Sequence, residues 1–163
     1  MIILGIDPGF GRVGWGVVEK INGNWTHVAH GCIETFQDKT FLERLEQVSE
    51  QLRQVIEKYK PDHSAVEELF FSKNAKTVID VAQARGVIML TINQQGIPIM
   101  ELTPLQVKQA IVGYGRAEKT QVQKMLKILL QLEKIPKQDD AADALAVAMA
   151  CASQINFQKK VNG

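Results

Sequence analysis

The sequence lacks the residues and segments that mark several common protein classes. Its two cysteines, Cys32 and Cys151, are too few for a disulfide framework or a metal cluster, so we expect them to be packing groups. Its three histidines are scattered. No apolar run approaches the roughly 20 residues that span a bilayer, and the N-terminus lacks the charged and apolar segments of a secretion signal. We therefore expect a cytoplasmic protein with no membrane partner.

The sequence also lacks a strong excess of either charge. The formal net charge is +1 and the isoelectric point is about 7.8, so the overall balance does not indicate a nucleic-acid partner. The distribution is uneven, because residues 1–68 carry 7 basic against 11 acidic side chains, and residues 69–137 carry 10 against 4. An acidic half before a basic half suits an acidic catalytic centre beside a basic binding surface. A solvated surface of mixed charge would give the same asymmetry.

The pattern of apolar residues predicts one α/β domain with a mixed sheet. At 163 residues the chain is long enough for a single domain, which we expect over 1–157, with a flexible tail over 158–163. Periodicity, turn residues and helix caps predict five strands, at 2–6, 12–20, 25–36, 63–69 and 97–102. The same signals predict five helices, at 40–59, 74–92, 103–112, 118–132 and 139–155.

One carboxylate ends the first strand. Ile2–Ile6 is apolar throughout, which predicts a central strand buried on both faces. Asp7 follows it directly and precedes Pro8 and Gly9, where a buried strand meets a turn. A charge there is costly unless it is paired. Position alone leaves two roles open for Asp7, a cap of its own turn or a ligand.

Two further segments carry acids in apolar surroundings. Glu67 and Glu68 lie in an apolar strand, and since successive strand residues point to opposite faces, one of the two at most can face Asp7. The spacing does not say which. Asp140 and Asp143 share one face of the last helix among alanines, which would let its backbone lie close to the sheet. Asp139 is explained by the helix dipole, which favours acids in the first turn.

Converging carboxylates would favour a metal ion. They repel one another, and a cation relieves the repulsion. All-oxygen ligands suit Mg²⁺ or Mn²⁺ rather than zinc. Two such ions can activate water and stabilise the leaving oxygen in phosphodiester hydrolysis. The sequence therefore indicates a two-metal phosphoryl-transfer site, in which Gly9 and Gly11 would keep the space beside Asp7 clear.

The ordered motifs between about residues 2 and 150 resemble the RuvC family of Holliday junction resolvases. They are G-I-D-P-G, A-V-E-E-L-F-F, A-Q-A-R-G, V-K-Q-A-I-V-G-Y-G-R-A-E-K-T-Q-V-Q and D-A-A-D-A-L-A. The resemblance implies an RNase H-like fold, a homodimer, and an endonuclease that resolves four-way DNA junctions by paired symmetric nicks. It also implies two Mg²⁺ ions per active site, for which Mn²⁺ would substitute, and branch-migration helicases as partners.

The resemblance also implies roles for individual residues. Asp7, Glu67, Asp140 and Asp143 match the family's metal-binding carboxylates, which selects Glu67 over Glu68. Lys108 and Lys119 match basic residues near the active site that could contact a phosphate, and Lys119 could also assist catalysis. Phe70 matches an aromatic residue that could stack on a base, while Phe71 suits core packing. Weaker candidates for DNA contact are Lys73, Asn74, Lys76, Arg85 and Arg116, each of which would serve equally well as a solvated surface group.

Three other functions fit parts of the sequence. ATPases of the actin, sugar kinase and Hsp70 type also begin with a strand and a D-x-G turn, but this chain is too short for their two domains. A non-catalytic junction-binding protein would not need four carboxylates. A related RNase H-like hydrolase could act on RNA or RNA–DNA hybrids. Comparing cleavage of a four-way junction, a hybrid duplex and linear DNA separates these functions.

Overall fold

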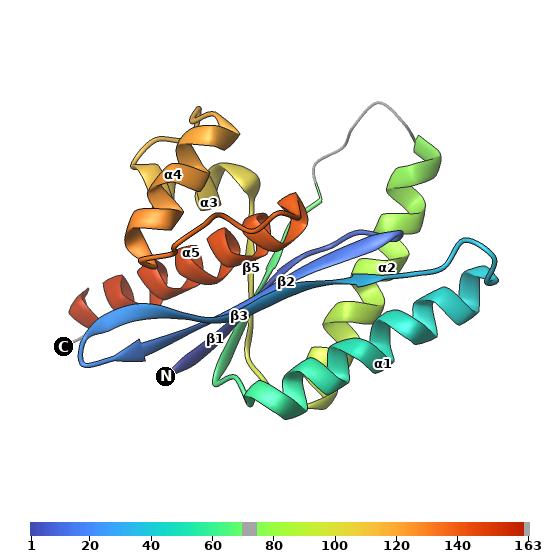
Figure 1. The fold of residues 1–163 in the computed structure, drawn as a ribbon. Helices are drawn as coiled ribbons and strands as arrows, with labels where there is room; N and C mark the ends of the chain where they lie inside the picture. The colour runs from blue at the N-terminus through green and yellow to red at the C-terminus, as the bar shows by residue number, and fades with distance from the viewer. Residues whose placement is uncertain (70–74, 162–163) are drawn as a thin grey trace.

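The chain folds into three layers, with a central sheet covered by helices on both faces (Figure 1). The computed structural model describes residues 1–69 and 75–161. Within the second of these ranges it describes the side chains of residues 78–158. In chain order the strands are β1 (Ile2–Asp7), β2 (Arg12–Ile21), β3 (Asn24–Glu34), β4 (His63–Glu67) and β5 (Ile99–Leu102). The helices are α1 (Phe41–Tyr59), α2 (Ala75–Gln94), α3 (Pro104–Val112), α4 (Lys119–Leu129) and α5 (Asp139–Val161).

The sheet has the order β3-β2-β1-β4-β5. Strands β1 to β3 are antiparallel neighbours, whereas β4 and β5 run parallel to β1, which confirms the predicted mixed five-stranded sheet. The turn between β2 and β3 is at Asn22 and Gly23, whose φ angles of 50° and 88° suit a tight hairpin turn. Because β1 lies at the centre under both helical layers, Ile3, Leu4 and Ile6 are fully buried.

Two hydrophobic cores fill the spaces between the layers. Neighbouring residues of β1 point to opposite faces, so Leu4 packs with Leu52 of α1 and Ile88 of α2, whereas Ile3 packs with Leu145 of α5. Helices α3, α4 and α5 cover this second face. Both cores therefore hold β1 in place, and Asp7 directly follows its buried residues.

Most helix boundaries follow the predicted signals. Thr40 forms the expected capping box with Glu43 at the start of α1, and Thr103 forms one with Gln106 at the start of α3. Helix α4 ends at Leu129, three residues earlier than predicted, because the chain turns through a left-handed conformation at residue 131, where φ is 51°.

The last helix is longer than predicted. Helix α5 continues to Val161, beyond the predicted end at residue 155 and into the predicted tail over 158–163. Residues 158–161 are helical because neither proline nor glycine interrupts the chain from 139 to 161. The last two residues, 162 and 163, lie outside the described part of the chain.

Both cysteines are free thiols in packed surroundings. Burial raises the pKa of Cys151 to about 12 and is also the main cause that raises the pKa of Cys32 to about 11. Thiols that stay protonated are poor nucleophiles, which fits the packing role predicted for them. Within the described ranges, no helix combines the length and the apolar character that crossing a bilayer requires.

Candidate active site

Asp7 and Glu67 lie side by side at the ends of two neighbouring strands. Strands β1 and β4 are parallel with Ile6 beside Val66, so the next residue of each strand leaves the sheet at the same edge. Both carboxylates are half-buried. Glu68 is exposed, and its backbone amide continues the pairing with β5. The register therefore places Glu67 rather than Glu68 next to Asp7.

Helix α5 crosses the sheet at a distance that only glycine allows. A Cβ at Gly5 would lie 2.1 Å from a carbonyl oxygen of α5, and one at Gly14 would lie 2.0 Å from the carbonyl oxygen of Asp140. Gly14 is also the cross-strand partner of Asp7. The first turn of α5 is thus held beside Asp7, and Asp143 follows on the same helix face. The close approach that the alanines of α5 predict therefore also requires glycines in the sheet.

Burial and repulsion between neighbouring acids raise the cost of ionising Asp7, Glu67 and Asp143. Burial raises the pKa of Asp7 to about 8, and repulsion by Glu67, Asp143 and Asp140 adds to the rise. Burial, with repulsion by Asp143, raises the pKa of Glu67 to about 7. Burial also raises the pKa of Asp143, although Lys119 opposes the rise. Such a cluster favours the uptake of positive charge.

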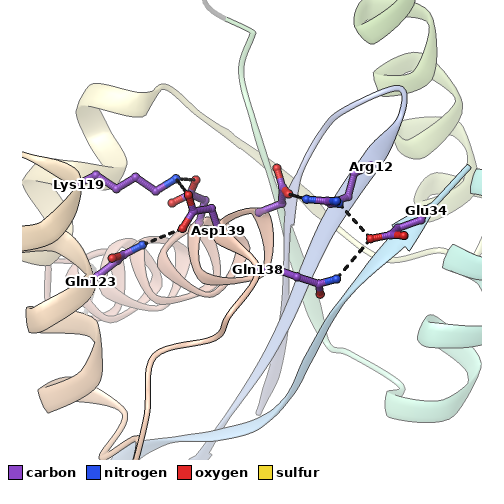
Figure 2. Close-up of polar contacts among 8 residues, drawn as sticks. Arg12, Glu34, Lys119, Gln123, Gln138 and Asp139 are labelled. Atoms are coloured by element: carbon purple, nitrogen blue, oxygen red, sulfur yellow. Dashed lines mark hydrogen bonds and ion pairs between the residues drawn. The ribbon is translucent and has the colours of Figure 1, made fainter.

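Lys119, the first residue of α4, bridges two acids of α5 (Figure 2). Its Nζ lies 2.9 Å from Oδ2 of Asp143 and 3.3 Å from Oδ2 of Asp139. Gln123, one turn further along α4, donates a 3.3 Å hydrogen bond to Asp139. Partial burial acts to lower the pKa of Lys119, but its bonds to Asp143 and Asp139 raise it overall, so the amine stays charged. Asp139 therefore pairs with α4 as well as starting a helix.

Arg12 supplies a second cation, which the sequence analysis missed (Figure 2). Its NH1 lies 3.2 Å from Oδ2 of Asp140, and its Nε lies 3.1 Å from Oε1 of Glu34. A basic residue five positions after Asp7 was visible in the sequence. Its partners were not, because they arrive from β3 and α5, far along the chain.

A cleft of about 200 Å³ opens beside two of the carboxylates. Glu67 and Asp143 line it together with Lys108 of α3 and Lys119 of α4. Its remaining walls are apolar and come from Pro104, Val107, Val122 and Ala146. Carboxylates, lysines and an apolar floor thus meet in one place, where an anionic group could reach both lysines.

The donor set fits hard divalent cations. In the structure as it stands, however, these side chains are not yet close enough to share an ion. Among residues 1–69 and 75–161, no group of three Asp, Glu, His or Cys side chains could hold a metal ion. Two of the four carboxylates instead face Arg12 and Lys119, which neutralise them in part. Carboxylate oxygens are the ligands that Mg²⁺ and Mn²⁺ prefer, and the raised pKa values of Asp7, Glu67 and Asp143 would fall once a cation bound.

Comparison with known proteins shows the family. The model of the family described as crossover junction endodeoxyribonuclease RuvC matches residues 3–151. This chain belongs to the RuvC family. It is 56% identical to the crossover junction endodeoxyribonuclease RuvC of Petrotoga mobilis over 91% of each chain. It is 50% identical to the one of Thermosipho melanesiensis, over 96% of this chain and 100% of the relative.

Solved structures agree with the RuvC assignment. Thermus thermophilus RuvC in complex with a Holliday junction substrate has a TM-score of 0.91 with this chain and is 31% identical, over 97% of this chain and 96% of that one. Thermus thermophilus RuvC alone has a TM-score of 0.90 at 30% identity, over 97% of both chains. These matches confirm the RNase H-like fold that the motifs implied.

The structure separates the DNA-contact residues suggested by the RuvC resemblance. Lys108 and Lys119 line the cleft, and Arg116 is exposed in the loop before α4. Arg85 faces inward, because its Nε donates a 3.1 Å hydrogen bond to the carbonyl oxygen of Glu67. The remaining candidates, Phe70, Phe71, Lys73 and Asn74, and the side chain of Lys76, lie outside the described residues.

The glycines near Asp7 have different surroundings. A Cβ at Gly9 would meet the carbonyl oxygen of Arg12 at 2.0 Å, so the tight turn itself requires glycine there. Among the described residues, a Cβ at Gly11 would come closest to the guanidinium of Arg44, at 3.7 Å. That Gly9 and Gly11 keep the space beside Asp7 clear stays a prediction, whereas Gly14 clears space for the start of α5.

Proposed function

We propose that this chain is a structure-selective endonuclease that resolves four-way DNA junctions by paired symmetric nicks. Support comes from the family match over residues 3–151 and from relatives of about 50% identity that are named crossover junction endodeoxyribonucleases. The observation that carries the proposal is the meeting of Asp7, Glu67 and the first turn of α5 at one edge of the sheet. Acids so placed suit metal-dependent phosphodiester hydrolysis.

Asp7, Glu67, Asp140 and Asp143 would hold two Mg²⁺ ions, for which Mn²⁺ would substitute. When bound, such ions supply an acidified water and charge stabilisation of the leaving 3′ oxygen. Asp7 is the central ligand in this proposal, because it lies between Glu67 on the neighbouring strand and Asp140 above its cross-strand partner Gly14. Its burial would make its negative charge strongly attractive to a cation.

The basic residues would hold the phosphate. Lys119 already faces Asp143, so an amine that moved to a phosphate oxygen would stabilise charge there without leaving the cleft. Lys108 lines the same cleft and would act as a second point charge on the backbone. The apolar floor that Val107 and Val122 provide would exclude bulk water and strengthen both contacts. Arg116, Phe70, Lys73 and Asn74 remain proposed contacts with the DNA.

We also propose that the whole nuclease works as a homodimer in the cytoplasm, with branch-migration helicases as partners. Two active sites on a two-fold axis would match the symmetry of a four-way junction. Ile79 and Leu90 of α2 are 59% and 56% exposed and would suit an apolar interface. Residues 1–157 would form one nuclease domain, because both cores share the single sheet.

Cleavage of defined DNA substrates tests the proposed function. The protein should nick a mobile four-way junction symmetrically in Mg²⁺ or Mn²⁺, and should cut an RNA–DNA hybrid or linear duplex far more slowly. Asp7→Asn should bind the junction and fail to cut it. Glu67→Gln should behave likewise, whereas the matched change Glu68→Gln should leave cleavage unchanged, since Glu68 is exposed. Equal cleavage by Asp7→Asn and the unaltered protein would overturn the proposal.

A further inference from the structure

One arginine connects the acidic site to an acid on the outermost strand. Arg12 contacts Asp140 through NH1 and Glu34 through Nε, at 3.2 Å and 3.1 Å (Figure 2). Glu34 also accepts a 3.3 Å hydrogen bond from the amide of Gln138, which directly precedes α5. Figure 2 shows Arg12 beside Glu34, and its contact with Asp140 means that a single guanidinium is shared between a proposed metal ligand and a residue outside the site.

The sharing depends on a β-bulge in the hairpin. Near the turn Val18 pairs with His27, but the next pair is Val17 with Ala29, which leaves Val28 as an extra residue on β3. Every pair beyond the bulge is shifted by one position, so Arg12 lies opposite Glu34. Without the extra residue the shift would be absent and Arg12 would face residue 33. The bulge therefore delivers an acid, instead of an apolar residue, to Arg12.

We propose that Arg12 competes with divalent metal for Asp140, and that Glu34 is a positioning residue that holds Arg12 when the metal takes its place. The inference rests on the metal role proposed above for Asp140. Arg12 must leave Asp140 before a metal binds there, and this lowers the affinity for the metal. Because Glu34 is a second acid within reach of Arg12, it makes this departure easier. The Arg12–Glu34 pair thus sets the metal concentration at which the site is occupied.

The two members of the pair act in opposite directions. Arg12→Gln removes the competing charge, so metal binding should become tighter. Glu34→Gln removes the alternative partner, so Arg12 should remain on Asp140 and metal binding should become weaker. Because Arg12 is 47% exposed, water screens its ion pairs, so we expect changes of only about twofold to fivefold in each direction.

Calorimetric titration with Mn²⁺ alone tests the inference without any cleavage reaction. The set comprises the unaltered protein, Arg12→Gln, Glu34→Gln and the double variant. If Glu34 acts through Arg12, its substitution should have little effect once Arg12 is gone, so the two changes should be non-additive. Arg12→Lys should retain the competition. Arg53→Gln and Glu57→Gln change the same charges on the exposed side of α1 and should leave the affinity unchanged.

The outcomes separate this inference from the proposed function. Equal Mn²⁺ affinities for Arg12→Gln, Glu34→Gln and the unaltered protein would overturn the inference while the nuclease assignment stood. Additive effects in the double variant would overturn the role of Glu34 as a positioning residue. If the unaltered protein neither bound Mn²⁺ nor cut a junction, the proposed function itself would fail. Tighter binding in Arg12→Gln with weaker binding in Glu34→Gln supports the inference.

Discussion

The hydroxyl of Thr35 donates a 2.9 Å hydrogen bond to the carbonyl oxygen of Phe10, three residues after Asp7. Thr35 in turn accepts a 2.9 Å hydrogen bond from Nε of Arg44, whose guanidinium lies 3.8 Å from the centre of the Phe10 ring. The backbone amide of Thr35 also donates to the carbonyl oxygen of Gly11. The turn that follows Asp7 is therefore fixed by a buried threonine and an arginine from α1.

Replacing Thr35 should weaken the turn and slow cleavage. Thr35 is 8% exposed, so Thr35→Val would leave a carbonyl and a guanidinium without their partner, which costs about 1–3 kcal/mol of unfolding free energy. Cleavage should fall several-fold because the displaced turn directly follows Asp7. Urea unfolding and single-turnover junction cleavage measure the two effects. Thr26→Val removes a comparable hydrogen bond, to Glu19, far from the site and should lower stability alone. Equal cleavage by both variants would contradict the role of Thr35.

Adding one methyl group at Gly5 should separate α5 from the sheet. The new Cβ would lie 2.1 Å from the carbonyl oxygen of Ala144, which rigid backbone cannot accommodate without moving. We expect Gly5→Ala to lose more than about 3 kcal/mol of stability and nearly all cleavage, since Asp140 and Asp143 move with the helix.

Gly86→Ala is the matched control. No atom of another described element lies within 4 Å of a Cβ added at Gly86, which is inside α2, so this variant should gain about 0.5–1 kcal/mol. Chemical denaturation measures both.

The sequence was sufficient for most of the fold because its signals are local. The apolar run of β1, the turn at Asn22 and Gly23 and the capping box at Thr40 each act within a few residues. The end of α5 was missed because residues 156–161 carry neither a stop signal nor a clear apolar period. In such a segment, local propensity does not decide where a helix ends.

The part of the site that could not be predicted depends on register. Which glutamate lies beside Asp7 follows from the pairing of Ile6 with Val66, and strand periodicity alone left that choice open. The Arg12–Glu34 pair depends on the bulge at residue 28, which has no reliable local signal. Family resemblance selected Glu67, but no motif pointed to Arg12 or Glu34.

Asp7 should make the stability of the metal-free protein depend on pH. Its pKa rises from 3.8 to about 8 on folding, so its contribution to stability is fully present below pH 4 and is lost as the pH rises toward 8. Asp7→Asn does not lose stability in this way, because its side chain does not ionise. Because each pKa unit corresponds to about 1.4 kcal/mol, the advantage of Asp7→Asn should grow by at least about 2 kcal/mol from pH 5 to pH 8.

Urea unfolding in a metal chelator at pH 5, 6.5 and 8 measures this difference. The control is Asp38→Asn, which makes the same substitution in an exposed turn outside the acidic site. Added Mg²⁺ should reverse the order at pH 8, because the metal stabilises the protein that binds it. A difference between Asp7→Asn and the unaltered protein that stayed constant with pH would contradict the burial of an acid at this site.

Arg85 should act on catalysis rather than on DNA binding. Its Nε donates to the carbonyl oxygen of Glu67, its NH2 pairs with Glu101 on β5, and its side chain is 17% exposed. Arg85→Gln should therefore let the end of β4 shift and reduce the cleavage rate about tenfold, since misplacement of a catalytic group by 1 Å can cost more than this. Its Kd for a four-way junction, measured in a chelator, should not change.

Arg116→Gln is the contrasting variant. It removes an exposed cation and should weaken junction binding, while the single-turnover rate at saturating DNA stays the same. Weaker binding by Arg85→Gln at an unchanged rate would instead make Arg85 a DNA contact.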